Sequence, residues 1–288
     1  MWHQGAEVFN WIWQADFYRR PLQDETGKPL WELLICDSEG SFQFSAVCRQ
    51  GAANSNWLAS QLQQQAQTHN LPDLIQVFRP QSLGLIEAAG KVLGVKVEAT
   101  RRTAALKLLL QQRAKEYSSM PNYTGETYSP IALDSPPPVP LPENLWGDGW
   151  RFASLPAGDI EDAFQGRPLP ILEMPELLLP LNLGLASTVP VPGVVIDGGR
   201  QSMRLAKWLQ DAKPLALNYL AGEPDGLILE AGLVDRWVVA TFEDSEVKAA
   251  AQIYQQRKQL SKGLHFLLVQ PDDSGMTYTG FWLLNFDR

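Results

Sequence analysis

The sequence predicts two α/β domains with mixed sheets, and three observations support this. In both halves of the chain, apolar segments of strand length alternate with longer segments in which apolar residues recur at helical spacing. A proline-rich segment, ALDSPPPVPLPENLWGDG at 132–149, separates the two series and excludes helix and central strand. Hydrophobic residues make up 45% of the 288, as in a globular protein with a sizeable core. We predict an N-terminal domain at 1–130, a stiff linker at 131–150 and a C-terminal domain at 151–288.

The first domain is predicted to begin with three strands and to continue with alternating helices and strands. The turn-forming segments DETGK and DSEG separate the first three strands, which predicts an antiparallel meander. Asn54 or Ser55 can cap the first helix. The elements in order are strands 15–21, 29–36 and 41–48, helix 54–69, strand 74–78, helix 82–94, strand 95–99 and helix 103–117. Alternating strands and helices imply right-handed crossovers and parallel pairing. The order βββαβαβα is typical of ribonuclease-H-like domains.

The second domain is predicted to be a mixed sheet that ends in an antiparallel hairpin of two apolar strands. A second proline-rich segment, STVPVPGVV from Ser187, leads into it. The elements in order are strand 193–197, helix 200–212, strands 214–220, 226–232 and 236–242, helix 245–260, and strands 265–271 and 279–286. The turn DDSG at 272–275 connects the last two strands.

Composition argues against several classes of protein. No stretch of 18 apolar residues is present, so we expect no membrane span. The N-terminal segment lacks a basic region, a continuous apolar core and a small-residue cleavage site, so we expect no signal peptide. Two cysteines and three scattered histidines give neither a disulfide framework nor a zinc site, which fits a reducing, cytoplasmic compartment. We find no nucleophile–base set and no complete phosphate-binding motif. We therefore predict no catalytic residues, no metal and no cofactor.

Charge is unevenly distributed over the chain, whose net charge is −8. Residues 1–130 hold 12 Lys or Arg and 12 Asp or Glu, whereas residues 131–288 hold 12 and 20. Phosphate contacts supply most of the non-specific affinity for nucleic acid. An acidic chain that binds nucleic acid must therefore gather its basic groups locally.

Carboxylates on the first strands leave a nuclease open as an alternative function. Asp16, Glu32 and Asp37 lie on or beside these strands, and Glu116 lies near the end of the last helix of the domain. Nucleases that use two metal ions need several converging carboxylates. The simpler interpretation, which we favour, is that these groups are solvated and the scaffold is inactive.

Arginines at strand ends are the stronger candidates for a binding site. VFRPQ places Arg79 and Gln81 after one predicted parallel strand, and EATRRT places Arg101 and Arg102 after the next. Open α/β sheets bind ligands at the carboxyl ends of their strands. Arginine suits both bidentate phosphate contacts and stacking on bases. The alternative is that these arginines pair with carboxylates such as Glu32, Asp37 or Glu98.

Several stretches, in the same order along nearly the whole chain, resemble the Tab/Atab proteins of chloroplasts and cyanobacteria. These stretches are DFYRRPLQDETGKPLWELLICD, NSNWLASQL, VFRPQ, ATRRTAALKLLLQQR, YSSMPNY, LILEAGLVDRWVVATF and GLHFLLVQPDDSGMTYTGFWLL. The resemblance implies a non-catalytic RNA-binding translation factor. Its expected partner is single-stranded RNA in the 5′ untranslated region of the mRNA for a photosystem I reaction-centre subunit. The family's closing Trp-Leu-Leu, linked there to RNA binding, corresponds to Trp282, Leu283 and Leu284.

The resemblance also bears on compartment and partners. Because the match begins within the first 20 residues, we expect no transit peptide and a cyanobacterial, cytoplasmic protein. Translation or photosystem assembly proteins are further candidate partners. A protein-interaction assembly factor that does not touch RNA stays open as a third function.

The closing segment GFWLL poses a question about exposure. In a strand, Phe281 and Leu283 point to one face, and Trp282 and Leu284 to the other. Since both pairs are apolar, we expect a strand covered on both faces, with Trp-Leu-Leu structural in the first place.

Overall fold

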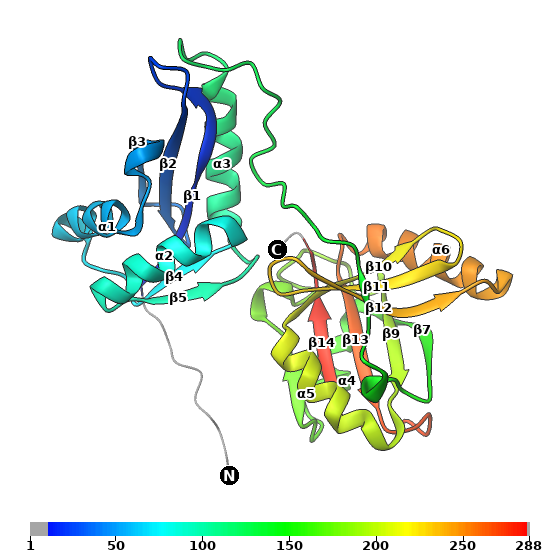
Figure 1. Cartoon of the computed structure of the whole chain (residues 1–288). Helices are drawn as coiled ribbons and strands as arrows, with labels where there is room; N and C mark the ends of the chain where they lie inside the picture. The colour runs from blue at the N-terminus through cyan, green and yellow to red at the C-terminus, as the bar shows by residue number, and fades with distance from the viewer. Residues whose placement is uncertain (1–10, 287–288) are drawn as a thin grey trace. The chain divides into compact units, whose positions relative to one another are not determined.

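The computed structural model describes residues 11–286, which divide into two compact units between Asp134 and Ser135 (Figure 1). Each unit packs helices against mixed sheets, so the predicted fold class, two α/β domains, is confirmed. No helix in this described stretch is both long and apolar enough to cross a bilayer.

Unit 1 (residues 11–134 of the described chain) is built on one five-stranded sheet of order β3-β2-β1-β4-β5. β1, β2 and β3 form the predicted antiparallel meander, and β4 and β5 continue the sheet parallel to β1. The order of strands and helices along unit 1 is the βββαβαβα order that the sequence predicted as ribonuclease-H-like. The strands are β1 (Ile12–Gln23), β2 (Pro29–Asp37), β3 (Gln43–Arg49), β4 (Leu74–Val77) and β5 (Lys96–Ala99).

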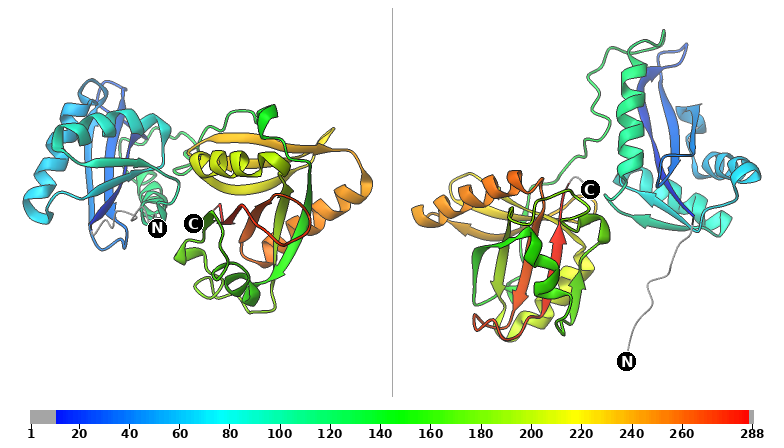
Figure 2. Two further views of the ribbon diagram at one scale, coloured as in Figure 1. Left: turned by 90° about the horizontal axis from the view of Figure 1, so that it is seen from below. Right: turned by 180° about the vertical axis from the view of Figure 1, so that it is seen from behind.

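Helices cover both faces of this sheet, because β2 is apolar on both sides (Figures 1 and 2). Leu33 and Ile35 pack with α1 (Ser55–His69) and α2 (Pro80–Leu93), whereas Leu34 and Cys36 pack with α3 (Ala104–Tyr117). A short turn, η1 (Gln50–Ala52), precedes α1. The Asn54 side chain accepts a hydrogen bond from the Trp57 amide and caps α1, as predicted.

The chain beyond α3 returns along β1 as an irregular segment, residues 122–134, which we call the strap. Its start pairs with the far end of β1: the Gln23 amide donates to the Asn122 carbonyl at 3.0 Å, and the Thr124 amide to the Pro21 carbonyl at 3.0 Å. The last register pair between β1 and β4 joins Gln14 to Gln76. The strap therefore lies where β1 has continued past the end of β4.

Unit 2 contains two sheets, a division that the sequence did not predict. One has the order β7-β9-β13-β14-β8 and the other β10-β11-β12-β6. The strands are β6 (Val139–Pro140), β7 (Gly149–Pro156), β8 (Ile171–Glu173), β9 (Pro190–Asp197), β10 (Pro214–Leu220), β11 (Asp225–Ala231), β12 (Asp235–Phe242), β13 (His265–Gln270) and β14 (Gly280–Leu284). β13 and β14 form the predicted antiparallel apolar hairpin.

Three α-helices and four short turns complete unit 2 in the described chain. α5 and α6 pack on the core that the two sheets share, and α4 packs on the outer core of the larger sheet. The proline-rich segment contributes to the shared core through Leu141 and Leu145. The helices and turns are η2 (Glu143–Leu145), η3 (Ala157–Asp159), α4 (Ile160–Phe164), η4 (Glu176–Leu178), η5 (Gly199–Gln201), α5 (Ser202–Ala212) and α6 (Ser245–Leu260).

β14 is an internal strand covered on both faces, as predicted. It lies between β13 and β8, with Trp282 and Leu284 in the shared core and Phe281 and Leu283 in the outer core. Trp282 is 2% exposed. Its ring lies over Gly280, where an added Cβ would stand 2.5 Å from the ring carbon Cη2. Glycine at this position therefore makes room for the tryptophan.

A buried histidine connects the two sheets of unit 2. The Leu217 amide of β10 donates to His265 Nε2 of β13 at 2.8 Å, so Nδ1 carries the proton and donates to the Gly263 carbonyl at 2.8 Å. Lys258 Nζ donates to the Leu217 carbonyl at 2.7 Å. Burial, together with the nearby Lys258 charge, holds the pKa of His265 well below its ordinary value. His265 is therefore a neutral structural residue.

Candidate functional site

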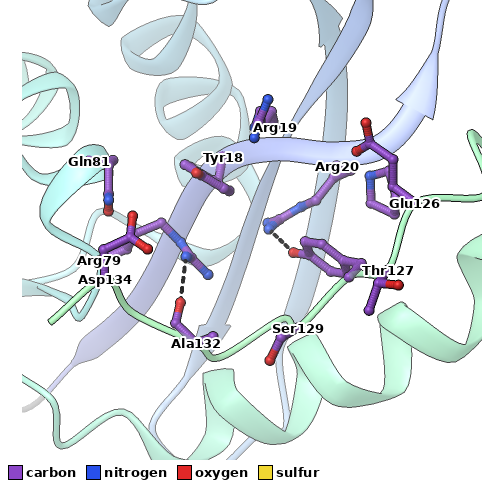
Figure 3. A pocket seen from close by; sticks show the side chains of 12 residues that line it. Tyr18, Arg19, Arg20, Arg79, Gln81, Glu126, Thr127, Ser129, Ala132 and Asp134 are labelled. Atoms are coloured by element: carbon purple, nitrogen blue, oxygen red, sulfur yellow. Dashed lines mark hydrogen bonds between the residues drawn. The ribbon is translucent and has the colours of Figure 1, made fainter.

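A pocket of about 300 Å³ opens in unit 1 where β1 runs past the end of β4 (Figure 3). Its lining comes from residues 18–21 of β1, from Arg79 and Gln81 at the junction of β4 and α2, and from strap residues 126–129, 132 and 134. The carboxyl end of a parallel strand beside a change in strand pairing is where open α/β sheets bind ligands.

A buried ionic cluster forms the floor of this pocket. Asp16 of β1 and Glu32 of β2 are fully buried, and Arg20 lies between them, with Nη1 2.9 Å from Asp16 Oδ2 and Nε 3.2 Å from Glu32 Oε2. Arg79 Nε contacts Asp16 Oδ1 at 2.9 Å, and Arg113 Nη2 contacts Glu32 Oε1 at 2.9 Å. Each carboxylate is thus held by two guanidinium groups, which is what makes its burial tolerable.

Arg79 holds the strap in place. Its Nη1 and Nη2 donate to the carbonyls of Ala132 at 3.3 Å and Pro130 at 2.6 Å. Its guanidinium lies 4.4 Å from the centre of the Tyr18 ring, a cation–π contact. With its nitrogens used in this way, Arg79 shapes the wall of the pocket and is not a free cation.

Two tyrosines complete the floor. Arg20 Nη1 donates to the Tyr128 hydroxyl at 2.8 Å, and the Tyr117 hydroxyl donates a short hydrogen bond to Glu32. Burial raises the pKa of both tyrosines, so both phenols stay neutral. Burial disfavours the charge of Arg20, but Asp16, Tyr128, Tyr117 and Glu32 together outweigh it, and the pKa of Arg20 lies above its ordinary value.

The rim carries side chains that remain accessible. Arg19 and Gln81 are exposed, as are Glu126 and Asp134 of the strap. In Figure 3, Gln81 and Asp134 lie on one side of the opening and Glu126 on the other. The rim thus offers one cation, an amide and two carboxylates around an aromatic ring. That set suits hydrogen bonding to a polar planar group better than binding of a phosphate.

The other arginines predicted as site residues lie outside the pocket lining. Arg101 is buried, and Arg102 is exposed just after β5. Of the residues predicted at strand ends, Arg79 and Gln81 are therefore brought together at the pocket. Trp282, Leu283 and Leu284 are all buried in unit 2.

The carboxylates considered for a nuclease do not form one open site. Asp16 and Glu32 are joined by Arg20, but Asp37 accepts a hydrogen bond from Ser41 in the turn after β2. Glu116 is exposed and pairs with Arg113 at 2.5 Å. Within residues 11–286, no three His, Cys, Asp or Glu side chains gather in an arrangement that could hold a metal ion.

Sequence reasoning considered Asp16 only as a possible metal ligand and did not single out Tyr18, Arg20 or the strap residues. Asp16, Tyr18 and Arg20 alternate along β1 and share one face, so their spacing carried a signal for an ion pair beside an aromatic ring. The strap residues carried no such signal, because their place beside β1 depends on tertiary contacts.

Solved structures with partial likeness come from retroviral integrases. The catalytic core domain of HTLV-2 integrase in complex with magnesium is 16% identical, with a TM-score of 0.28, over 41% of this chain and 78% of that one. A simian T-cell lymphotropic virus intasome, in complex with PP2A regulatory subunit B56 gamma, is 13% identical, with a TM-score of 0.29, over 51% of this chain and 63% of that one. Values this low support no inference about function.

Similarity of sequence is much closer to two plant proteins. The chain is 34% identical over 277 residues to "Protein TAB2 homolog, chloroplastic" of Zea mays, covering 94% of this chain and 70% of the relative. It is 31% identical over 278 residues to the protein of the same name in Arabidopsis thaliana, covering 94% and 74%. Family models described as RNA-binding protein Tab2/Atab2 match residues 12–113 with an N-terminal domain and 128–285 with a C-terminal domain. The chain therefore belongs to the Tab2/Atab2 family of RNA-binding proteins.

Proposed function

We propose that the protein binds single-stranded RNA without catalysing a reaction, and that the pocket of unit 1 takes one nucleobase. The proposal rests on one observation: an aromatic ring and exposed hydrogen-bonding groups surround a pocket of about 300 Å³. That volume is at the lower end of the usual range for ligand pockets, about 300–1,000 Å³. It suits a single splayed base, which only unpaired RNA presents.

Each accessible group has a role in this proposal. Tyr18, half-buried on β1, offers a ring against which a base can stack. Gln81 and Arg19 can donate hydrogen bonds to base carbonyls and ring nitrogens. Asp134 and Glu126 can accept them from exocyclic amino groups. The buried arginines keep the floor neutral and the strap fixed.

The finer role rests on the family and on the names of its relatives. We propose that the RNA is the 5′ untranslated region of an mRNA for a photosystem component, and that binding regulates its translation. Partner proteins in translation or photosystem assembly belong to the same proposal. A cyanobacterial, cytoplasmic setting stays a prediction, since the two relatives are named as chloroplastic.

The test is a titration of fluorescent single-stranded RNA against the wild type and rim variants. We expect Gln81→Ala and Arg19→Ala to weaken binding, and Tyr18→Leu to weaken it about 5- to 150-fold, the value of one base stack. The control is Arg49→Ala, which removes an exposed arginine paired with Glu25 outside the pocket. A further variant, Arg102→Ala, tests by the same titration whether the exposed arginine after β5 contacts RNA. Equal affinity of all rim variants would exclude the pocket.

The same preparations test the nuclease alternative. Incubation of RNA and DNA with the protein and Mg²⁺ or Mn²⁺ should leave both intact, because Asp16 and Glu32 are already held by arginines. Cleavage that is lost in Asp16→Asn would overturn the non-catalytic function.

A further inference from the structure

A row of three cations runs along η5 and α5 of unit 2. Arg200 lies in η5, and Arg204 and Lys207 lie in α5, all three exposed. Arg204 and Lys207, three residues apart, lie on one side of α5, about 4.5 Å apart along its axis. Arg200 lies in the 3-10 turn that leads into the helix. We call these residues the α5 row.

The α5 row has no partner within the described part of the chain. None of its three side chains forms a hydrogen bond or ion pair with any residue between 11 and 286. Apart from the half-buried Arg257, the other cations of unit 2 in that stretch do have partners; they are Arg151, Arg167, Lys213, Arg236, Lys248, Lys258 and Lys262.

This arrangement is unexpected in an acidic unit. Residues 131–288 carry 20 Asp or Glu against 12 Lys or Arg, so acidic partners are abundant. Asp211, four residues after Lys207, does not pair with it. Three adjacent unpaired cations make a local positive surface that suits an anionic ligand with repeated charges.

Aromatic surface lies next to the α5 row. Trp208 follows Lys207, is half-buried, and meets Trp237 of β12 edge to face, with ring centres 5.2 Å apart. Cations beside a partly accessible aromatic ring are the usual composition of a surface that follows a single nucleic-acid strand. Phosphates contact the cations while a base can stack on the ring.

We propose that the α5 row binds the phosphodiester backbone of single-stranded RNA. The inference rests on the proposed function, and it supplies what the pocket of unit 1 lacks. At that pocket, Arg20 and Arg79 are neutralised by buried carboxylates, and the exposed Arg19 stands with Glu126 and Asp134. A base can be recognised there, but the phosphate contacts that supply most of the affinity must come from elsewhere.

The salt dependence of RNA binding tests the α5 row. In Arg200→Ala/Arg204→Ala/Lys207→Ala, the plot of log affinity against log salt should become less steep by about 2, since each phosphate contact on a single strand contributes about 0.7. Affinity at 50 mM salt should fall about tenfold or more. The matched control, Lys28→Ala/Lys91→Ala/Lys115→Ala, removes the same charge from exposed lysines of unit 1 and should change the slope much less.

The outcomes separate the two proposals. If the wild type does not bind single-stranded RNA, the proposed function fails. If it binds and the α5 variant keeps the wild-type affinity and slope, or loses no more than the control, the α5 row is not a contact while the proposed function stands. Circular dichroism of each variant checks that it is folded.

A milder double variant, Arg204→Gln/Lys207→Gln, should still reduce the slope of log affinity against log salt by about 1.4.

Discussion

Strands β1 and β2 of unit 1 and strand β14 of unit 2 bury side chains of different kinds. In unit 1, the buried face of β1 and β2 carries Asp16, Arg20 and Glu32, whereas in unit 2 the equally buried β14 carries only apolar side chains. The position after a parallel strand pointed to Arg79, near the first group, as an RNA contact. The family resemblance linked Trp282, in the second, to RNA binding, although its burial was expected. Both side chains are buried. Arg79 lines the pocket of unit 1, whereas Trp282 lies in the shared core of unit 2. A buried group can shape a binding site where a cavity reaches it, so the two candidates are not equivalent.

The largest expected effect tests the apolar side of this comparison. Trp282→Ala should lower the free energy of unfolding by about 3–5 kcal/mol, because it leaves a large cavity in the shared core of unit 2. Urea unfolding, with hydrogen exchange to separate the units, measures it. Trp146→Ala, which removes a ring that is 57% exposed, should cost far less. RNA affinity per folded molecule should be unchanged; a specific loss would make Trp282 a contact residue after all.

The next effect tests the ionic side. Glu32→Gln keeps the shape but removes the charge that Arg20 and Arg113 share, and should cost about 2–3 kcal/mol. Hydrogen exchange should rise in β1 and β2 and not in unit 2. Glu25→Gln is the control, because its side chain is 87% exposed and its pair with Arg49 contributes about 0–1 kcal/mol. If the two variants are equally stable, the cluster is not needed for stability.

A smaller effect depends on pH and belongs to unit 2. His265 has a lowered pKa in the folded state. Below pH 6.5, the ordinary pKa of histidine, the unfolded chain therefore binds a proton that the folded chain does not. Its contribution to stability is complete above pH 6.5 and declines as pH falls, by about 1.4 kcal/mol per pH unit. Urea unfolding of unit 2 between pH 7.5 and 5.5 measures this slope. His265→Gln should flatten it, and the exposed His69→Gln should not.

The smallest effect should be the same in both units. Asn54 caps α1 of unit 1, and Asp244 caps α6 of unit 2 by accepting from the Glu246 and Val247 amides. Alanine at either position should cost about 1 kcal/mol. Thermal unfolding with exchange at each helix start measures both losses. Clearly unequal stability losses would show that the composition of each core also affects the stability of the helices at its surface.

Much of the fold followed from periodicity. In unit 1, each strand segment carried apolar residues in alternation or in a run, and turns or helices separated the segments, so order and topology could be predicted together. In unit 2, strands β9 to β14 were predicted. That β10, β11 and β12 leave the main sheet was not predicted, because alternation indicates which face is buried and not which strand is the neighbour. β8 is three residues long, and β7 follows the proline-rich segment, so neither was recognised.

The candidate site could be predicted only in part. Arg79 and Gln81 follow a parallel strand, and the rule for strand ends located them. That Arg79 would be neutralised depends on Asp16, which is 63 residues away and reaches it only through the β1–β4 pairing. The strap has no periodicity of its own. Its position depends on carbonyl groups, which carry no signal in the sequence.

The contact between Gly280 and Trp282 has a consequence for comparing sequences. Because a side chain at position 280 would occupy the space of the indole ring, the residue at one position limits which residues fit at the other. A related chain with a larger residue at the first position must carry a smaller or displaced one at the second, so the two should covary. A search for distant relatives that uses glycine and tryptophan two residues apart would therefore detect this sheet whether or not the RNA contacts persist.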